Sequence, residues 1–145
     1  MRISLDEPKV LVLHHVLAVV ESVLDREGIR NRVVIVSACY SGIFAKRLAS
    51  PDSIVLTAAD ENSTSFGCSN EREWTYFGDA FFNQSLGENV SLEQAFEDAK
   101  AKISQWEARD ELPPSSPQGH FGAAISEKLA KLKPGKKMQA ATEER

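Results

Sequence analysis

Hydrophobic positions in the middle of the chain form two short, continuous runs. Residues 33–36 and 53–58 are rich in β-branched side chains, which is typical of strands buried on both faces of a parallel sheet. Residues 43–48, between them, are long enough for a short helix. The centre of the chain therefore predicts a strand–helix–strand unit with a right-handed parallel crossover.

On both sides of this unit the apolar residues recur at helical spacing. Ser91 and Gln94 have the spacing of a capping box at a helix start. Four further helices are predicted: from Pro8 to a stop at Gly28, from about residue 74 or 75 to Leu86, from Ser91 to Pro113, and over residues 121–132. Residues 134–145 are polar, and we expect them to form a disordered tail.

Two strands are too few for the sheet that their composition implies. A sheet of two parallel strands leaves both edges open and buries little area. Either short strands lie in the long loops, or neighbouring strands come from a partner chain or from a preceding segment. An exposed sheet edge also predicts self-association.

Composition narrows the class of protein. The chain has 145 residues, 42% of them apolar and 26% charged, which fits one globular domain and excludes a disordered or fibrous protein. A net charge of −4 argues against nucleic acid as a partner. No apolar run reaches the roughly 18 residues of a membrane span, and no targeting signal indicates a compartment. Two cysteines are too few for a disulfide scaffold or a four-thiolate zinc site, and we expect no metal and no cofactor.

Cys39 is the strongest candidate for chemistry. It follows the first predicted strand and precedes a helix, at the carboxyl edge where open α/β sheets place catalytic groups. Backbone amides at a helix start favour a thiolate, so Cys39 is a candidate nucleophile; the alternative is a structural cysteine. A phosphate-binding loop is excluded, because Ala45 stands where a thiol phosphatase needs arginine and there is no Gly-Lys-Ser/Thr.

A nucleophilic cysteine needs a base, usually histidine. His14 and His15 lie in the first predicted helix, and His120 lies in what we expect to be an exposed loop. None of the three forms a convincing pair with Cys39 on sequence grounds, and the alternative for each is an ordinary surface or packed histidine.

The polar loop after the second strand is the other candidate region. Its hydroxyls and carboxylates leave the carboxyl end of a strand, so they are expected to reach the same cleft as Cys39. The alternative is a solvated loop with helix caps, in which Asp79 faces solvent. Cys68 has no second thiol or histidine at metal-ligand spacing.

Taken in order, these segments resemble the legumain family of clan CD cysteine peptidases, especially its bacterial branch. The similarity rests on VVIVSACYSG at 33–42, TAA at 57–59, TSFGC at 64–68 and TYFGD at 75–79, and it covers most of residues 28–125. It implies a caspase-like three-layer α/β/α fold with a parallel sheet. It also implies an endopeptidase that cleaves a peptide or protein substrate after Asn, and sometimes after Asp.

By this resemblance, Cys39 is the nucleophile that forms an acyl-enzyme, and its backbone amide is one arm of the oxyanion hole. Ser37, Thr64, Ser65 and Asp79 fall at substrate-binding positions. Asp79 suits Asn, because its carboxylate accepts from the substrate amide NH₂. Ser37 stands where animal and plant members carry an acidic residue.

One part of the family pattern is missing. Its catalytic histidine belongs to a His-Gly pair that precedes the cysteine, and this sequence holds neither that pair nor the family's N-terminal pocket arginine. We therefore expect residues 1–133 to be the C-terminal part of a peptidase domain that lacks its N-terminal strands, with weak activity or none. The alternatives are a non-catalytic remnant and an α/β protein-binding module whose cysteine is structural.

Overall fold

A three-stranded sheet forms the middle of the molecule. The computed structural model describes residues 8–67, 72–88 and 91–132, and the sheet has the order β1-β2-β3. Strands β1 (Arg32–Val36) and β2 (Ser53–Thr57) run parallel, with Val36 opposite Thr57. Strand β3 (Gln118–Phe121) runs antiparallel to β2, with Phe121 opposite Ile54. The predicted parallel pair is confirmed, and one short strand did lie in a long loop.

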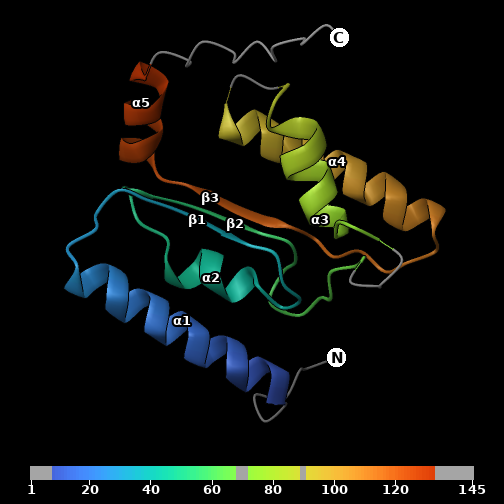
Figure 1. Cartoon of the computed structure of the whole chain (residues 1–145), viewed down its shortest axis with the longest axis horizontal. Helices are drawn as coiled ribbons and strands as arrows, with labels where there is room; N and C mark the ends of the chain where they lie inside the picture. The colour runs from blue at the N-terminus through green and yellow to red at the C-terminus, as the bar shows by residue number, and fades with distance from the viewer. Residues whose placement is uncertain (1–7, 68–71, 89–90, 133–145) are drawn as a thin grey trace, which may run out of the picture.

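Helices cover both faces of the sheet, as Figure 1 shows. One face carries α1 (Pro8–Arg26) and α2 (Gly42–Arg47). The other carries α3 (Tyr76–Gly78), which continues into the π-helix η1 (Asp79–Ser85), and α4 (Leu92–Arg109). Helix α5 (Ala123–Lys131) follows β3 and packs against β2. This arrangement agrees with the predicted three-layer α/β/α fold of the caspase and legumain type.

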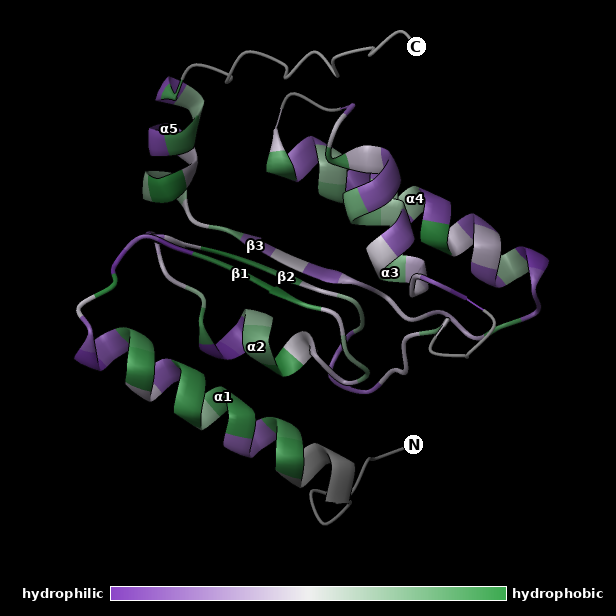
Figure 2. Cartoon of the chain, in the orientation of Figure 1, coloured by the Kyte–Doolittle hydropathy of each residue, from purple (hydrophilic) through white to green (hydrophobic). Residues whose placement is uncertain are grey.

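Two separate apolar clusters fill the spaces between the layers. The cluster under α3, η1 and α4 is built on aromatic rings, with Phe77, Phe81 and Phe96 almost fully buried. The cluster under α1 and α2 is smaller and centres on Leu17, Phe44, Leu48 and Val55. Figure 2 shows that hydrophobic residues nevertheless run along much of α1. Part of that helix therefore presents apolar side chains to solvent: Val12, Val16, Val19 and Val23.

The two parallel strands differ in burial. All five residues of β2 are buried, whereas Val33 of β1 is 45% exposed. The prediction of a strand buried on both faces is thus correct for β2 and wrong for β1. The reason is position, because β2 has a strand on each side, while β1 pairs only with β2 within the described ranges.

Two predicted helices differ from the structure. Residues 118–121 form β3, so the last helix begins only at Ala123. Gly119 allows this strand to pass α4, since a Cβ there would lie 2.7 Å from the Phe96 ring. The single helix predicted to end at Leu86 is largely π-wound. The expected Ser91 cap is confirmed, because its Oγ accepts from the Gln94 N–H at 3.2 Å.

The predicted polar tail at 134–145 lies outside the described residues.

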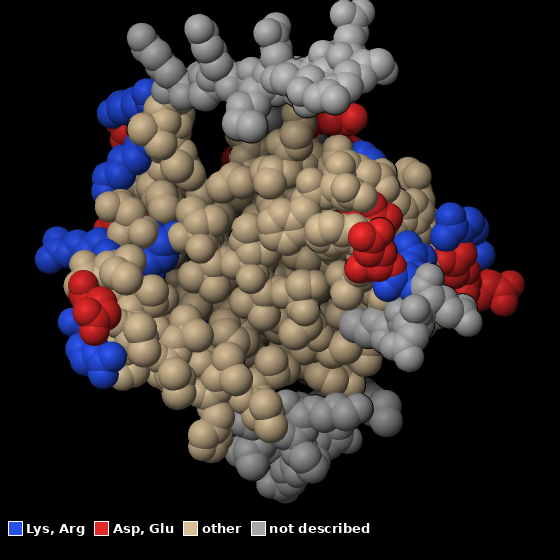
Figure 3. Space-filling model, viewed as in Figure 1, with Lys and Arg blue, Asp and Glu red and all other residues tan. Residues whose placement is uncertain are grey.

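Figure 3 shows uncharged side chains in the middle of one face and charged groups of both signs around its margins. Among the described helices, none is both long and apolar enough to cross a membrane.

Candidate active site

Cys39 lies in the turn that joins β1 to α2, and it is half-buried. The next residue, Tyr40, has a φ of +58°, a left-handed conformation that side chains other than glycine adopt rarely. The buried Ser41 holds the turn in place. Its Oγ donates to the Ala38 carbonyl at 2.6 Å and accepts from the Ala59 N–H at 3.3 Å. The cysteine turn is therefore tied to the residues that follow β2.

The Cys39 thiol lies against the loop after β2. The Ser65 N–H donates to Sγ at 3.3 Å, and Sγ is 3.7 Å from Ser65 Oγ and 3.5 Å from the Ser65 carbonyl oxygen. The Tyr40 N–H donates to the Ser63 carbonyl at 2.8 Å. The structure thus brings together Cys39 and Ser65, two of the residues singled out from the sequence. Thr64 is half-buried beside them, and no contact just described involves its side chain.

Ser37 links the same edge of the sheet to α3. Its Oγ lies 3.2 Å from the Oγ1 of Thr75. Thr75 caps α3, because its Oγ1 accepts from the Gly78 N–H at 3.0 Å and its carbonyl accepts from the Asp79 N–H at 2.9 Å. A continuous set of hydrogen bonds therefore leads from the exposed end of β1 to Asp79. Sequence analysis named Thr75 only as the first residue of the TYFGD motif, although its position before an apolar run also indicates a helix cap.

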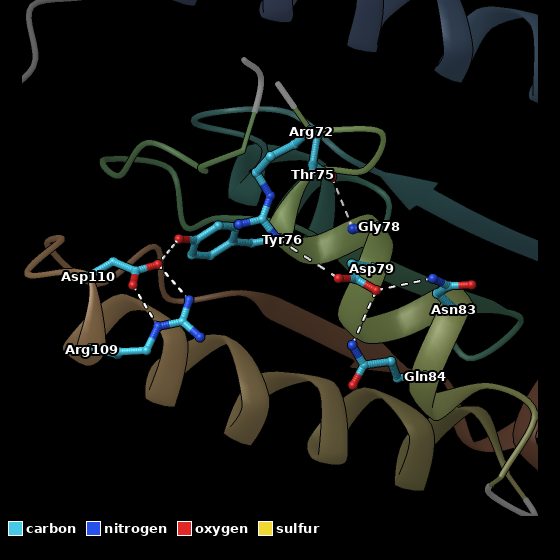
Figure 4. A network of polar contacts seen from close by, with 9 residues as sticks. All are labelled: Arg72, Thr75, Tyr76, Gly78, Asp79, Asn83, Gln84, Arg109 and Asp110. Atoms are coloured by element: carbon cyan, nitrogen blue, oxygen red, sulfur yellow. Dashed lines mark hydrogen bonds and ion pairs between the residues drawn. The ribbon is translucent and has the colours of Figure 1, made fainter. Parts of the chain in front are cut away.

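Asp79 is the first residue of the π-helix η1. The wider winding places the side chains four and five residues later on the same side as Asp79. Accordingly, the Asn83 and Gln84 side-chain amides both donate to Asp79 Oδ1, each at 3.2 Å (Figure 4). The other oxygen, Oδ2, lies 3.9 Å from an Arg72 guanidinium nitrogen. Asp79 is 23% exposed, so the reading of a carboxylate that simply faces solvent is wrong.

A second network of polar contacts runs from Arg72 through Tyr76 to Asp110. The Arg72 guanidinium lies 4.5 Å from the centre of the Tyr76 ring, and the Tyr76 hydroxyl donates to the Asp110 carboxylate (Figure 4). Arg109 donates to the same carboxylate at 2.6 and 2.8 Å. The Arg109 hydrogen bonds, followed by that of Tyr76, hold the pKa of Asp110 well below its usual range. The bond to Asp110 raises the pKa of Tyr76.

None of the three histidines hydrogen-bonds to the Cys39 thiol in the contacts described above. His14 and His15 lie on α1, as predicted. His120 is part of β3 and half-buried, so the prediction of an exposed loop is wrong. Its Nε2 lies 2.8 Å from the Ser50 carbonyl oxygen and 3.2 Å from the Ser50 nitrogen, which precede β2. Since Cys39 follows the opposite, carboxyl end of the sheet, this ring nitrogen is engaged away from the thiol.

Two surface cavities of the described part of the chain are lined by neither Cys39 nor Asp79. One of about 420 Å³ borders α2 and the start of the loop after β2, with Lys46, Asp60 and Glu61 in its wall. The other, about 380 Å³, lies between α4, β3 and α5. Within the described ranges, no group of three His, Cys, Asp or Glu side chains is placed to hold a metal ion. Cys68 is outside these ranges.

Comparison with known proteins agrees with this geometry. The model of the Peptidase C13 family matches residues 3–122, which is most of the chain. A search of curated proteins finds no match. The matched segment includes β1, the Cys39 turn, the loop after β2, η1 and β3. The chain therefore belongs to the Peptidase C13 family, the legumain family of clan CD cysteine peptidases.

Proposed function

We propose that this chain is a legumain-type cysteine endopeptidase that cleaves after Asn, or Asp, through Cys39. Family membership carries the coarser part, a cysteine peptidase acting on peptides or proteins. One observation supports the finer part: the Cys39 thiol lies against Ser65 at the carboxyl edge of the sheet, where hydrogen bonds also lead from the Ser37 hydroxyl through Thr75 to the backbone N–H of Asp79.

The proposed chemistry is acyl transfer to the Cys39 sulfur. The thiolate attacks the carbonyl carbon, the carbonyl oxygen becomes an oxyanion, and the Cys39 backbone N–H donates to it. Collapse of this intermediate breaks the C–N bond, and the leaving amine takes up a proton. Water then hydrolyses the thioester and releases the acid. The Ser65 N–H, which donates to Sγ at 3.3 Å, holds the sulfur against the loop after β2.

The residue before the scissile bond is read by the pocket at Asp79. An ionised carboxylate only accepts hydrogen bonds, so it pairs with the NH₂ of Asn. We assign Ser37, Thr64 and Ser65 to the same substrate-binding region, as the family resemblance implies. Ser37 is uncharged, and an uncharged wall leaves Asp79 as the acceptor that distinguishes Asn from Asp at neutral pH.

Turnover by this chain is expected to be slow. The contacts described for the Cys39 thiol go to Ser65, and the His120 ring is held at Ser50. Removing the base from a catalytic pair of nucleophile and base typically reduces the rate by several orders of magnitude. We therefore propose that residues 1–133 supply the nucleophile and pocket part of the peptidase domain, with weak activity on their own.

A second function is favoured by the outer edge of β1. Val33 is 45% exposed there, and α1, which packs against Val34 and Val36 of the same strand, carries further exposed valines. Such an edge can add a strand from another chain through main-chain hydrogen bonds. In this alternative the protein binds a peptide or a second copy of itself and cleaves nothing.

Quenched fluorescent peptides that differ only at one position separate the two functions. Peptides of the Ala-Ala-Asn, Ala-Ala-Asp and Ala-Ala-Lys type would be incubated with the wild type and with Cys39→Ala. We expect slow cleavage after Asn that disappears in Cys39→Ala. Equal cleavage of the Lys peptide, or cleavage that survives in Cys39→Ala, would overturn the proposal. No turnover of any peptide would favour the binding alternative.

A further inference from the structure

We propose that α1 and the outer edge of β1 form the interface of a symmetric dimer of this chain. In this dimer, α1 of one protomer packs antiparallel on α1 of its partner, and the two β1 strands pair across the same axis. The inference goes beyond the proposed peptidase activity and does not rest on it, because it uses none of the proposed catalytic or substrate-binding residues.

Four exposed valines form a stripe along α1: Val12, Val16, Val19 and Val23. Each of them is between 40% and 61% exposed, and none belongs to either apolar cluster of the described residues. Their spacing of four, three and four residues is the spacing of the seam between two packed helices. Figure 2 shows the hydrophobic character of the helix that carries this valine stripe.

The valine stripe points away from α2. Glu21 marks the side of α1 that faces α2, because its carboxylate accepts from Arg47, the last residue of α2, at 3.1 Å. At 3.6 residues per turn, the centre of the stripe lies roughly 170° around the helix from Glu21. Helix α2 packs against β2 and β3, whereas Leu17 of α1 shares its apolar cluster with Val34 and Val36 of β1. Since the sheet order is β1-β2-β3, the stripe faces outward beyond β1.

Strand β1 has an open edge on this same side of the molecule. Within the described ranges it pairs only with β2. Side chains alternate along a strand, so the exposed Val33 lies on the sheet face opposite Val34. An added strand with a helix over it would therefore cover the open edge and the valine stripe together.

A second copy of this chain supplies both that strand and that helix. The spacing of the stripe is the same in either direction, so an antiparallel pair places Val12 against the partner's Val23 and Val16 against the partner's Val19. A two-fold axis perpendicular to the sheet produces this helix pair and an antiparallel pair of β1 strands at the same time. Because the stripe is uncharged, it offers no group that would select a charged partner.

The area that a stable dimer needs also favours a joint interface of helix and strand. A specific interface buries about 800 Å² on each partner. The stripe extends over only roughly 17 Å of helix, at about 1.5 Å per residue, so α1 needs the β1 edge beside it. The strand pair adds main-chain hydrogen bonds and joins the two three-stranded sheets into one.

Sedimentation equilibrium of the full chain tests this interface. We expect the wild type to have twice its monomer mass of 16.0 kDa. Val16→Glu should raise the dissociation constant at least about a hundredfold, because it places a carboxylate without a partner in the seam. Ala18→Glu adds the same charge at an exposed position outside the stripe and should change the constant less than about threefold. Val16→Ser, with the same expected direction, replaces Val16→Glu if circular dichroism shows that this variant does not fold.

Two results would overturn the proposal. One is a wild-type monomer at high protein concentration, which would leave the valine stripe to a different partner. The other is a Val16→Glu protein that dimerises as tightly as Ala18→Glu.

Disulfide cross-linking tests the antiparallel arrangement. In a Cys39→Ala and Cys68→Ala background, Val12→Cys and Val23→Cys proteins would be oxidised with diamide, separately and as a mixture. We expect cross-linked dimers mainly in the mixture, since positions 12 and 23 meet across the axis while two copies of one position lie roughly 17 Å apart. Equal cross-linking in all three samples, or none in any of them, would overturn the proposed arrangement.

Discussion

Strands β1 and β2 have similar compositions, RVVIV and SIVLT, and different surroundings. Every residue of β2 is buried, between strands on both sides and helices on both faces. In β1, by contrast, Val33 is 45% exposed, and within the described ranges the strand pairs on one side only. β-Branched composition thus indicates a strand, while its neighbours decide how much of it leaves water.

The comparison also bears on function, because the candidate nucleophile follows the less enclosed strand. Cys39 owes its position less to packing of β1 than to contacts with residues that follow β2. Ser41 ties the turn to Ala59, and Ser65 contacts the thiol. The second strand and its loop therefore organise a site whose nucleophile the first strand carries.

A matched pair of valine-to-alanine substitutions, one in each strand, gives the largest expected difference in the free energy of unfolding. Val55→Ala removes a fully buried side chain of β2 and should lower the free energy of unfolding by roughly 2–3 kcal/mol, from lost burial and the remaining cavity. Val33→Ala in β1 should cost less than about 1 kcal/mol, because the side chain is already 45% exposed. Urea unfolding measures both. Equal losses would mean that β1 is as enclosed in solution as β2.

The hydrogen bond between the Cys39 turn after β1 and Ala59 after β2 gives the next largest effect. Ser41→Ala leaves the buried Ala59 N–H without its partner and should cost about 1–3 kcal/mol, with faster alkylation of Cys39 by iodoacetamide because the turn is loosened. Ser37→Ala, at an exposed position, serves as the control and should cost less than about 0.5 kcal/mol. A Ser41→Ala variant as stable as the control, with an unchanged alkylation rate, would show that the turn holds itself.

Self-association is the third distinction between the strands. The open side of β1 and the exposed valines of α1 predict that the wild type elutes above its monomer mass of 16.0 kDa in size-exclusion chromatography. Val33→Lys should shift the elution toward the monomer, because a charged edge opposes strand pairing. A compact wild-type monomer at high protein concentration would contradict the prediction.

The smallest effect concerns the pH dependence of stability that comes from the contact between Tyr76 and Asp110, on the helices that follow β2. The depressed pKa of Asp110 contributes stability that is present above its ordinary value of 3.8 and is lost as the pH falls below it. The raised pKa of Tyr76 contributes stability that is present below its ordinary value of 10.0 and is lost as the pH rises above it. Urea midpoints from pH 2 to 11 should therefore depend less on pH in Asp110→Asn than in the wild type. Parallel profiles would show that this contact does not form in solution.

Local patterns predicted much of the fold. The β1–α2–β2 unit and the α4 helix rest on continuous apolar runs, a cap and proline stops, which act over a few residues. Strand β3 escaped, because QGHF has neither alternation nor β-branched residues, and its strand state depends on pairing with β2. The π-winding of η1 escaped as well, since the sequence there reads as an ordinary helix.

The candidate site, like the fold, was predicted in part. Order along the chain placed Cys39 and the Ser65 loop at one edge, because both follow parallel strands. The group formed by Arg72, Tyr76 and Asp110 joins residues up to 38 positions apart, as the sequence numbering shows, and no local pattern links them. The environment of His120 was predicted wrongly for the same reason as β3, because His120 is part of that strand and its ring contacts the Ser50 carbonyl oxygen.

The most direct test of the central claim is the rate at which Cys39 is labelled by electrophilic peptides. Intact mass would be followed after adding an Ala-Ala-Asn probe or a matched Ala-Ala-Lys probe to the folded chain, with Cys39→Ala as the control. We predict faster labelling by the Asn probe and no such labelling in Cys39→Ala. Equal rates for the two probes, or Asn-selective labelling that persists in Cys39→Ala, would contradict a legumain-type pocket at Cys39.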